Sequence, residues 1–132
     1  MDTRKAARRW ASTWARAWPA QDADAIVALQ AEDGGHWASM FRPYHGRDGL
    51  RRYLDECFSE ESRPAVVRFG EPRVDGDLAA VEYWAQIYAR DQPTTISGCT
   101  VVRFDDAGLV AEARDYSHVR EGHHEPPVGI FG

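Results

Sequence analysis

The chain has 132 residues, of which 43% are hydrophobic and 28% are charged, and its formal net charge is −5. This length and composition are typical of one globular domain spanning residues 1–132, and they exclude an intrinsically disordered chain. The acidic balance argues against a nucleic-acid surface, because phosphate binding requires a clustered excess of basic side chains.

The sequence shows no membrane or secretory segment. No stretch approaches the ~20 apolar residues of a membrane span, and the first twenty residues have no continuous apolar core of a signal peptide. The two cysteines, Cys57 and Cys99, lie in periodic apolar segments, which favours buried thiols over a disulfide or a redox site. We therefore expect a cytoplasmic protein without membrane contact.

Two helices are expected first. Residues 3–18 predict a helix, because large apolar side chains recur there every four positions. These side chains are Trp10, Trp14 and Trp18. Pro19 marks the end of this helix, because it disfavours helical geometry for the preceding residue. Asp22 is a candidate N-cap for a second, shorter helix that runs through Ala31 and closes at Gly34-Gly35.

The third helix has the clearest pattern in the chain. Its apolar residues occur at i, i+3, i+4, i+7 and i+8, and they are Leu50, Tyr53, Leu54, Cys57 and Phe58. Arg47 or Asp48 lies at its start, and Asp48 is the better N-cap of the two. Between the second and third helices, residues 36–41 predict a short strand or a bridging segment, and residues 43–46 predict a turn.

From Pro64 onward the hydrophobic period changes from 3.6 to two, which is typical of strands. We expect four long strands, at Val66–Val74, Leu78–Ala89, Thr94–Phe104 and Leu109–Val119. Asp75-Gly76 is a strong hairpin signal, because a type I′ turn needs positive φ at both central positions. The expected order is helix, helix, short strand, helix and then four strands in an antiparallel meander, an α+β fold.

This order and several short phrases resemble the nuclear transport factor 2-like superfamily, and within it the SnoaL-like group, which is related to polyketide cyclases. The phrases are Phe41-Arg42-Pro43, Gly46-Arg47, Val74-Asp75-Gly76-Asp77, Val81-Glu82-Tyr83-Trp84, Gly98 and Ala113-Arg114-Asp115-Tyr116. The resemblance covers roughly residues 5–120. It implies a cone-shaped barrel, in which three helices cover the concave face of a strongly curved, mostly antiparallel sheet around a pocket. The fold alone does not define a function, because isomerases, hydrolases, cyclases, dehydratases and binding proteins share it.

Asp115 is the sharpest functional candidate. Alternation along the last strand groups it with the small and apolar side chains, which we expect on the concave face. Burial in an apolar cone raises the pKa of a carboxyl group, which suits a general base near neutral pH. Asp115 also matches an aspartate in the Arg-Asp-Tyr phrase of the limonene epoxide hydrolase branch. Alternatively, Asp115 pairs with an arginine or histidine, or accepts hydrogen bonds from a helix terminus.

Two known catalytic sets of the superfamily are missing here. The epoxide hydrolase branch also needs an arginine and a second aspartate on the long strand, where this chain has Tyr83 and Ala85. The ketosteroid isomerase branch uses a tyrosine on the first helix and an aspartate after the second. This chain offers Trp14 or Trp18 on the helix, and residues 37–41 contain no carboxylate.

The remaining candidates are one base, possible hydrogen-bond donors and apolar walls. Tyr53 and Tyr83 are candidate catalytic donors beside Asp115, since one base and one donor suffice for proton abstraction beside a carbonyl. Tyr53 can equally be a core tyrosine, and His36 a rim histidine without a role. The expected ligand-binding residues are Trp14, Trp18, His36, Phe41, Phe58, Phe69, Thr100 and Ser117. They predict a small hydrophobic or aromatic ligand.

We expect neither a cofactor nor a metal. The chain has no glycine-rich phosphate loop. His118, His123, His124 and Glu125 lie close together, but their spacing does not match a regular metal site.

The convex face of the sheet is expected to form a homodimer interface, because a large aromatic there alternates with charges. Its residues are Glu82, Trp84, Gln86, Val101, Arg103, Glu112, Arg114 and Tyr116. The tail, residues 120–132, becomes apolar again at its end, and we expect it to cover the pocket mouth or the partner subunit. Three functions therefore compete: an isomerase, cyclase or lyase with Asp115 as base, a non-catalytic binding module, and a dimeric accessory protein whose tryptophans fill the pocket.

Overall fold

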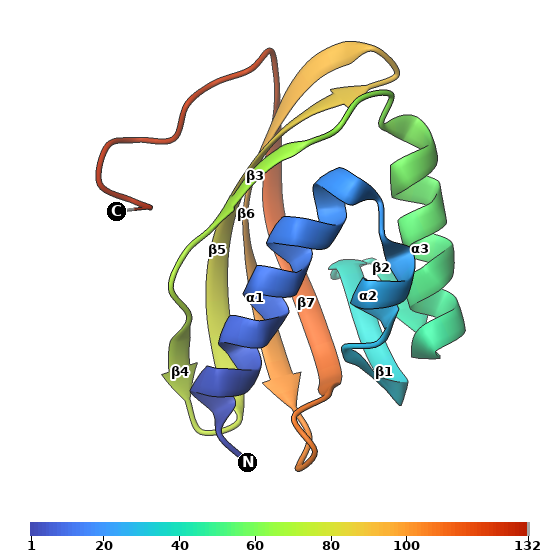
Figure 1. Ribbon diagram of the computed structural model, residues 1–132, viewed down its shortest axis with the longest axis vertical. Helices are drawn as coiled ribbons and strands as arrows, with labels where there is room; N and C mark the ends of the chain where they lie inside the picture. Colours follow the sequence, from blue (N-terminus) through green and yellow to red (C-terminus); the bar gives the residue numbers. More distant parts are fainter. Residues whose placement is uncertain (132) are drawn as a thin grey trace.

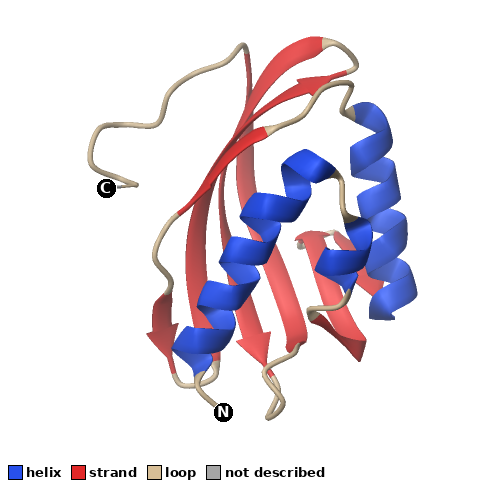
Figure 2. Ribbon diagram, viewed as in Figure 1, coloured by secondary structure: helices blue, strands red, loops and turns tan. Residues whose placement is uncertain are grey.

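A seven-stranded mixed sheet and three helices form the molecule (Figure 2). The computed structural model describes residues 1–131. Its helices are α1 (Thr3–Ala20), α2 (Ala23–Val27) and α3 (Gly46–Glu60). Its strands are β1 (Gln30–Ser39), β2 (Arg42–His45), β3 (Val66–Phe69), β4 (Arg73–Asp75), β5 (Leu78–Ala89), β6 (Gln92–Phe104) and β7 (Val110–Glu121). The predicted α+β class is confirmed.

The sheet has the strand order β2-β1-β7-β6-β5-β3, and β4 also pairs with β5. Among the strand pairs of residues 1–131, β1 and β7 are the only parallel pair. The long strands β5, β6 and β7 form the expected antiparallel meander, and the helices lie on one face of the curved sheet (Figure 1). Two differences from the expected order are local. Strand β2 occupies most of the turn predicted at residues 43–46, and the strand predicted over Val66–Val74 is divided into β3 and β4.

The first helix continues past its predicted end. Asp2 caps its start by accepting a hydrogen bond from the Lys5 amide, and Pro19 lies within its last turn. The helix closes at Gln21, whose left-handed backbone directs its N–H at the carbonyls of Ala17 and Trp18. This closure satisfies carbonyls that the end of a helix would otherwise leave unpaired. None of the helices in residues 1–131 is long and apolar enough to span a membrane.

The second helix is shorter than predicted. Asp22 caps it as expected, by accepting from the Ala25 amide, but the helix ends at Val27 and β1 begins at Gln30. Gly34 therefore lies within a strand rather than at a helix end. A Cβ at position 34 would overlap the carbonyl oxygen of Val110, so this glycine permits the close approach of β1 to β7.

The core lies between α1 and the inner face of the sheet. Along β5, the residues predicted to face inward are all buried, and they are Ala79, Val81, Tyr83, Ala85 and Ile87. Ala7 and Trp10 of α1 belong to the same buried cluster as Val81. The prediction was wrong at Val110, which is buried although parity placed it outward. A register shift between β6 and β7 beside Val110 moves it to the inner face.

The tail lies on the outer face of the sheet. The carbonyl oxygen of His124 accepts hydrogen bonds from Trp84 Nε1 at 2.7 Å and from Gln86 Nε2 at 2.9 Å. Farther along, the Arg68 guanidinium lies over the Phe131 ring. The tail thus covers part of the convex face instead of the pocket mouth, because its hydrogen-bond partners belong to the outward-facing set of β5. The homodimer through this face stays a prediction.

Candidate functional site

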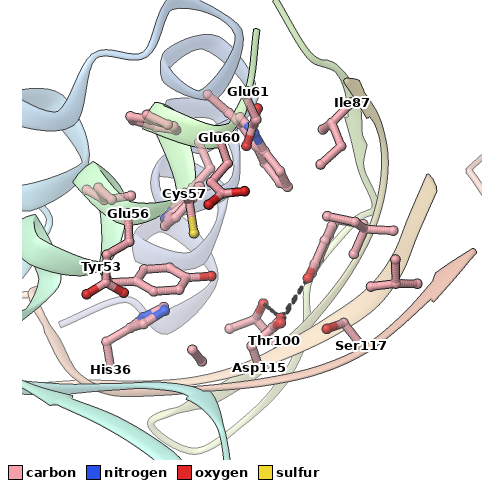
Figure 3. Close-up of a pocket in the computed structure, with 18 of the residues that line it drawn as sticks. His36, Tyr53, Glu56, Cys57, Glu60, Glu61, Ile87, Thr100, Asp115 and Ser117 are labelled. Carbon is pink, nitrogen blue, oxygen red and sulfur yellow. Dashed lines mark hydrogen bonds between the residues drawn. The ribbon is translucent and has the colours of Figure 1, made fainter. Parts of the chain in front are cut away.

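A cavity of about 700 Å³ opens between the inner face of the sheet and helices α1 and α3 (Figure 3). Ten of the eleven predicted site residues line it: Asp115, Tyr53, Tyr83, Trp14, Trp18, His36, Phe58, Phe69, Thr100 and Ser117. A cavity of this size lies within the range of small-molecule sites, so the tryptophans do not fill it.

Phe41 is the exception, and its prediction as a pocket wall was wrong. Its side chain is 94% exposed. Ser39 of β1 pairs with Arg42 of β2, which leaves Phe41 at the tip of a tight hairpin. A side chain at such a tip projects beyond the sheet and cannot reach its concave face.

Asp115 lies inside the cavity, as alternation along the last strand predicted. Its carboxylate accepts hydrogen bonds from the Tyr83 hydroxyl, at 2.9 Å and 3.0 Å to its two oxygens, and from Thr100 Oγ1 at 3.1 Å. Among residues 1–131 it forms no ion pair. Burial raises the pKa of Asp115, and the hydrogen bonds from Tyr83 and Thr100 lower it in part.

Tyr83 reaches Asp115 by lying across the neighbouring strand. Its ring packs against Phe69, with ring centroids 5.5 Å apart, and against Trp18, with centroids 5.9 Å apart. Burial and the nearby Asp115 carboxylate raise the pKa of Tyr83, so its hydroxyl stays protonated. A phenol has a single O–H, and here that proton is directed at Asp115.

His36 and Tyr53 form a second polar group on the cavity wall. His36 comes from β1 and Tyr53 from α3, and their ring centroids lie 4.6 Å apart. His36 is not at the rim: its side chain is buried, and this burial lowers its pKa to about 4, so the imidazole is neutral. Its Nε2 atom is buried without a hydrogen-bond partner within residues 1–131. Burial raises the pKa of Tyr53, whose hydroxyl points into the cavity (Figure 3).

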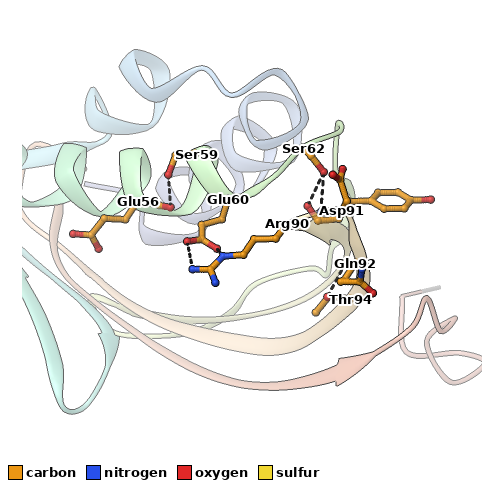
Figure 4. A network of polar contacts seen from close by, with 9 residues as sticks. Glu56, Ser59, Glu60, Ser62, Arg90, Asp91, Gln92 and Thr94 are labelled. Atoms are coloured by element: carbon orange, nitrogen blue, oxygen red, sulfur yellow. Dashed lines mark hydrogen bonds and ion pairs between the residues drawn. The ribbon is translucent and has the colours of Figure 1, made fainter.

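The opposite end of the cavity carries two glutamates that the sequence analysis did not single out. Glu61 follows α3 and accepts hydrogen bonds from Trp18 Nε1 at 2.9 Å and 3.2 Å. Burial raises the pKa of Glu61. Its neighbour Glu60 forms a bidentate ion pair with Arg90, at 2.6 Å and 2.8 Å (Figure 4). No local signal could have found Glu61, because its contact with Trp18 joins residues far apart in the chain.

Cys57 also lines the cavity, between these two ends. It is a free thiol, and burial raises its pKa, so it behaves as a protonated and weakly reactive side chain. In residues 1–131, no three histidine, cysteine or acidic side chains gather in an arrangement that could hold a metal ion.

Solved structures with the same fold cover most of this chain. SalBIII, described as an epoxide hydrolase/cyclase-like enzyme in pyran ring formation in the polyether salinomycin, is 20% identical with a TM-score of 0.76, over 89% of this chain and 96% of that chain. A hypothetical protein from Catenulispora acidiphila DSM 44928, with a ketosteroid isomerase-like fold and in complex with trimethylamine, is 18% identical with a TM-score of 0.70, over 80% and 82%. RV0760c from Mycobacterium tuberculosis is 18% identical with a TM-score of 0.75, over 92% and 100%. At these identities the similarity shows the fold alone.

The fold is therefore that of the nuclear transport factor 2-like superfamily, whose ketosteroid isomerase-like members share the three helices and the mixed sheet. The SnoaL-like domain family matches residues 8–113, which is most of the sequence. The chain belongs to the SnoaL-like family. No curated protein matches it in sequence.

Proposed function

We propose that the protein is a small-molecule isomerase, cyclase or lyase that removes a proton from a carbon beside a carbonyl group, with Asp115 as the base. The observation that carries this proposal is the environment of Asp115: a carboxylate inside a large, mostly apolar cavity, with hydrogen bonds from neutral donors only. Such a carboxylate is a stronger base than an exposed one, because desolvation disfavours its charged form.

In this reaction an Asp115 oxygen takes the proton, and the electron pair of the broken C–H bond moves into the carbonyl group to form an enolate. The negative charge that develops on the substrate oxygen needs a hydrogen-bond donor. Tyr53 is the better candidate of the two predicted tyrosines, because the Tyr83 proton is directed at Asp115. Tyr83 and Thr100 then position the base. Return of the proton from Asp115 to another carbon completes an isomerisation. In a cyclisation the enolate carbon attacks an internal carbonyl carbon, the electron pair of that carbonyl moves to its oxygen, and Asp115 returns the proton to this oxygen. In a lyase reaction the enolate expels a substituent from the neighbouring carbon, and Asp115 returns the proton to the leaving group.

The non-catalytic binding module remains the second candidate. It is supported by the indole wall of Trp10, Trp14 and Trp18, which adjoins the same cavity and suits a hydrophobic or aromatic ligand. In that case Asp115 orients the ligand without exchanging protons with it.

The description of SalBIII as cyclase-like agrees in general terms with the catalytic alternative.

Deuterium exchange separates the two functions without knowledge of the natural substrate. Benzo-fused cyclic ketones such as 1-tetralone and 2-tetralone are incubated in D₂O with the protein, and α-deuteration is followed by NMR. The catalytic proposal predicts that the unmodified protein deuterates the ketone faster than buffer alone does. Asp115→Asn should lower this protein-dependent rate about 10²-fold or more. Tryptophan fluorescence should show that both forms bind the ketone. Equal exchange rates with the two bound proteins would favour the binding module.

A further inference from the structure

The two ends of the cavity differ in how their carboxylates are neutralised. Of the four carboxylates that line the cavity, Glu60 pairs with Arg90 and Glu56 lies 3.8 Å from Arg42. Glu61 and Asp115 form no ion pair within residues 1–131. Two of the four carboxylates on the cavity wall therefore have no arginine to neutralise them.

A continuous aromatic surface joins these two carboxylates. Trp18 Nε1 donates to Glu61 at 2.9 Å, the Trp18 and Tyr83 rings lie 5.9 Å apart, and the Tyr83 hydroxyl donates to Asp115 at 2.9 Å. Figure 3 shows Glu61 and Asp115 at opposite ends of the cavity. Aromatic faces beside a carboxylate are a favourable environment for an organic cation, because the ring quadrupole and the negative charge both attract it.

An independent observation indicates that the cavity takes a ligand with a polar atom near Asp115. His36 lines the same cavity, and its Nε2 atom is buried and has no hydrogen-bond partner within residues 1–131. A buried polar nitrogen without a partner is costly, and a ligand oxygen or hydroxyl would satisfy it. The neutral imidazole cannot itself compensate the charges of Glu61 and Asp115.

From these contacts we propose that the ligand of this cavity is an organic cation: an ammonium group lies against Glu61 and Trp18, and an uncharged oxygen-bearing end lies at His36 and Asp115. This inference rests on the proposed function in one respect: it places the reacting carbonyl of the ligand at the Asp115 end of the cavity. A neutral ligand that covers the half-buried Glu61 would leave its carboxylate without a counter-charge, whereas an amine supplies that charge. The ligand class is thus an aromatic or hydrophobic amine.

The test uses two probes of equal shape, benzyltrimethylammonium and its uncharged carbon analogue neopentylbenzene. Binding is measured by quenching of tryptophan fluorescence, since three tryptophans line the cavity. The unmodified protein should bind the cation about tenfold more tightly than the analogue. The proposal is overturned if the analogue binds as tightly as the cation or more tightly, and this comparison needs no variant.

Two matched variants then locate the cation. Glu61→Gln keeps an oxygen that can accept from Trp18 Nε1 but removes the charge, and should lower cation affinity about tenfold without affecting the analogue. Glu60→Gln, the adjacent control, should leave both affinities within about twofold, because Arg90 already neutralises that carboxylate. Equal effects of the two substitutions would overturn the assignment to Glu61.

Asp115→Asn distinguishes this inference from the proposed function. The variant should lose ketone deuteration yet keep its preference for the cation over the analogue. Preference for the cation without any deuteration by the unmodified protein would refute the proposed function and leave the amine site standing. Deuteration without preference for the cation would refute the amine site and leave the proposed function standing.

Discussion

Gly98 of β6 lies directly opposite Tyr83 of β5, and a Cβ at position 98 would overlap the Tyr83 ring and its hydroxyl. The missing side chain of Gly98 is therefore what lets the tyrosine lie flat across β6 and reach the Asp115 carboxylate. A glycine inside a strand usually weakens it, and here it marks the close approach of an aromatic ring.

Substitution of Gly98 by alanine should displace Tyr83 from Asp115. The overlap is with a packed ring, so the substitution should destabilise the fold by about 1–3 kcal/mol. Urea unfolding measures this loss. Gly35→Ala is a suitable control, because a Cβ there would make only an ordinary contact with Trp37. A Gly98→Ala variant as stable as the control would contradict the packing described here.

Tyr83→Phe should raise the pKa of Asp115 above its value in the unmodified protein. The Tyr83 hydroxyl stabilises the charged carboxylate by donating to it, and its removal leaves the effect of burial less opposed. Carbon-detected NMR of the side-chain carboxyl follows this titration. Thr100→Val should shift the pKa in the same direction, and an unchanged or lowered pKa in both variants would show that these hydroxyls do not stabilise the carboxylate.

His36 should make the fold sensitive to acid. Its pKa is about 4 in the folded protein against an ordinary value of 6.5, so the unfolded chain binds the extra proton between these values. The stability that His36 contributes is present above pH 6.5 and is lost as the pH falls toward 4, by about 3 kcal/mol in total. Urea titrations from pH 7 to pH 4 should show a smaller loss for His36→Gln. If the free energy of unfolding fell equally with pH in the unmodified protein and in His36→Gln, the result would contradict a buried, neutral His36.

Removal of residues 123–132 should destabilise the fold but leave the cavity unchanged. Trp84 and Gln86 lose their shared acceptor, the His124 carbonyl, at a cost of about 1–3 kcal/mol. Benzyltrimethylammonium affinity should stay the same, because none of the described residues 123–131 lines the cavity. Trp84→Phe removes one of the two hydrogen bonds and should cost less than the truncation. A truncated protein with unchanged stability but weaker binding would place the tail at the pocket instead.

The parts of the site that local periodicity determines could be predicted from the sequence. A period of two assigned Tyr83 and Asp115 to the inner face, and a period of four assigned Trp14 and Trp18 to the inner side of α1. These assignments depend only on residues within one element. The same reasoning failed at Val110, where a register shift breaks the alternation.

The remaining features depend on contacts between distant segments. The burial of His36 results from the parallel pairing of β1 with β7, and no nearby residue indicates that pairing. Phe41 was assigned to the pocket because the pairing of Ser39 with Arg42, which places it at a hairpin tip, was not recognised. Glu61 gains its environment from Trp18, 43 positions away. Such contacts become visible only when the chain is folded.

The pH dependence of ketone deuteration tests the central claim most directly. If Asp115 is the base, the rate of α-deuteration should rise with pH as one group loses its proton, with an apparent pKa above the ordinary value for aspartate and higher still in Tyr83→Phe. The rise should vanish in Asp115→Asn. A profile that persists in Asp115→Asn, or that is insensitive to Tyr83→Phe, would contradict the assignment of Asp115 as the base.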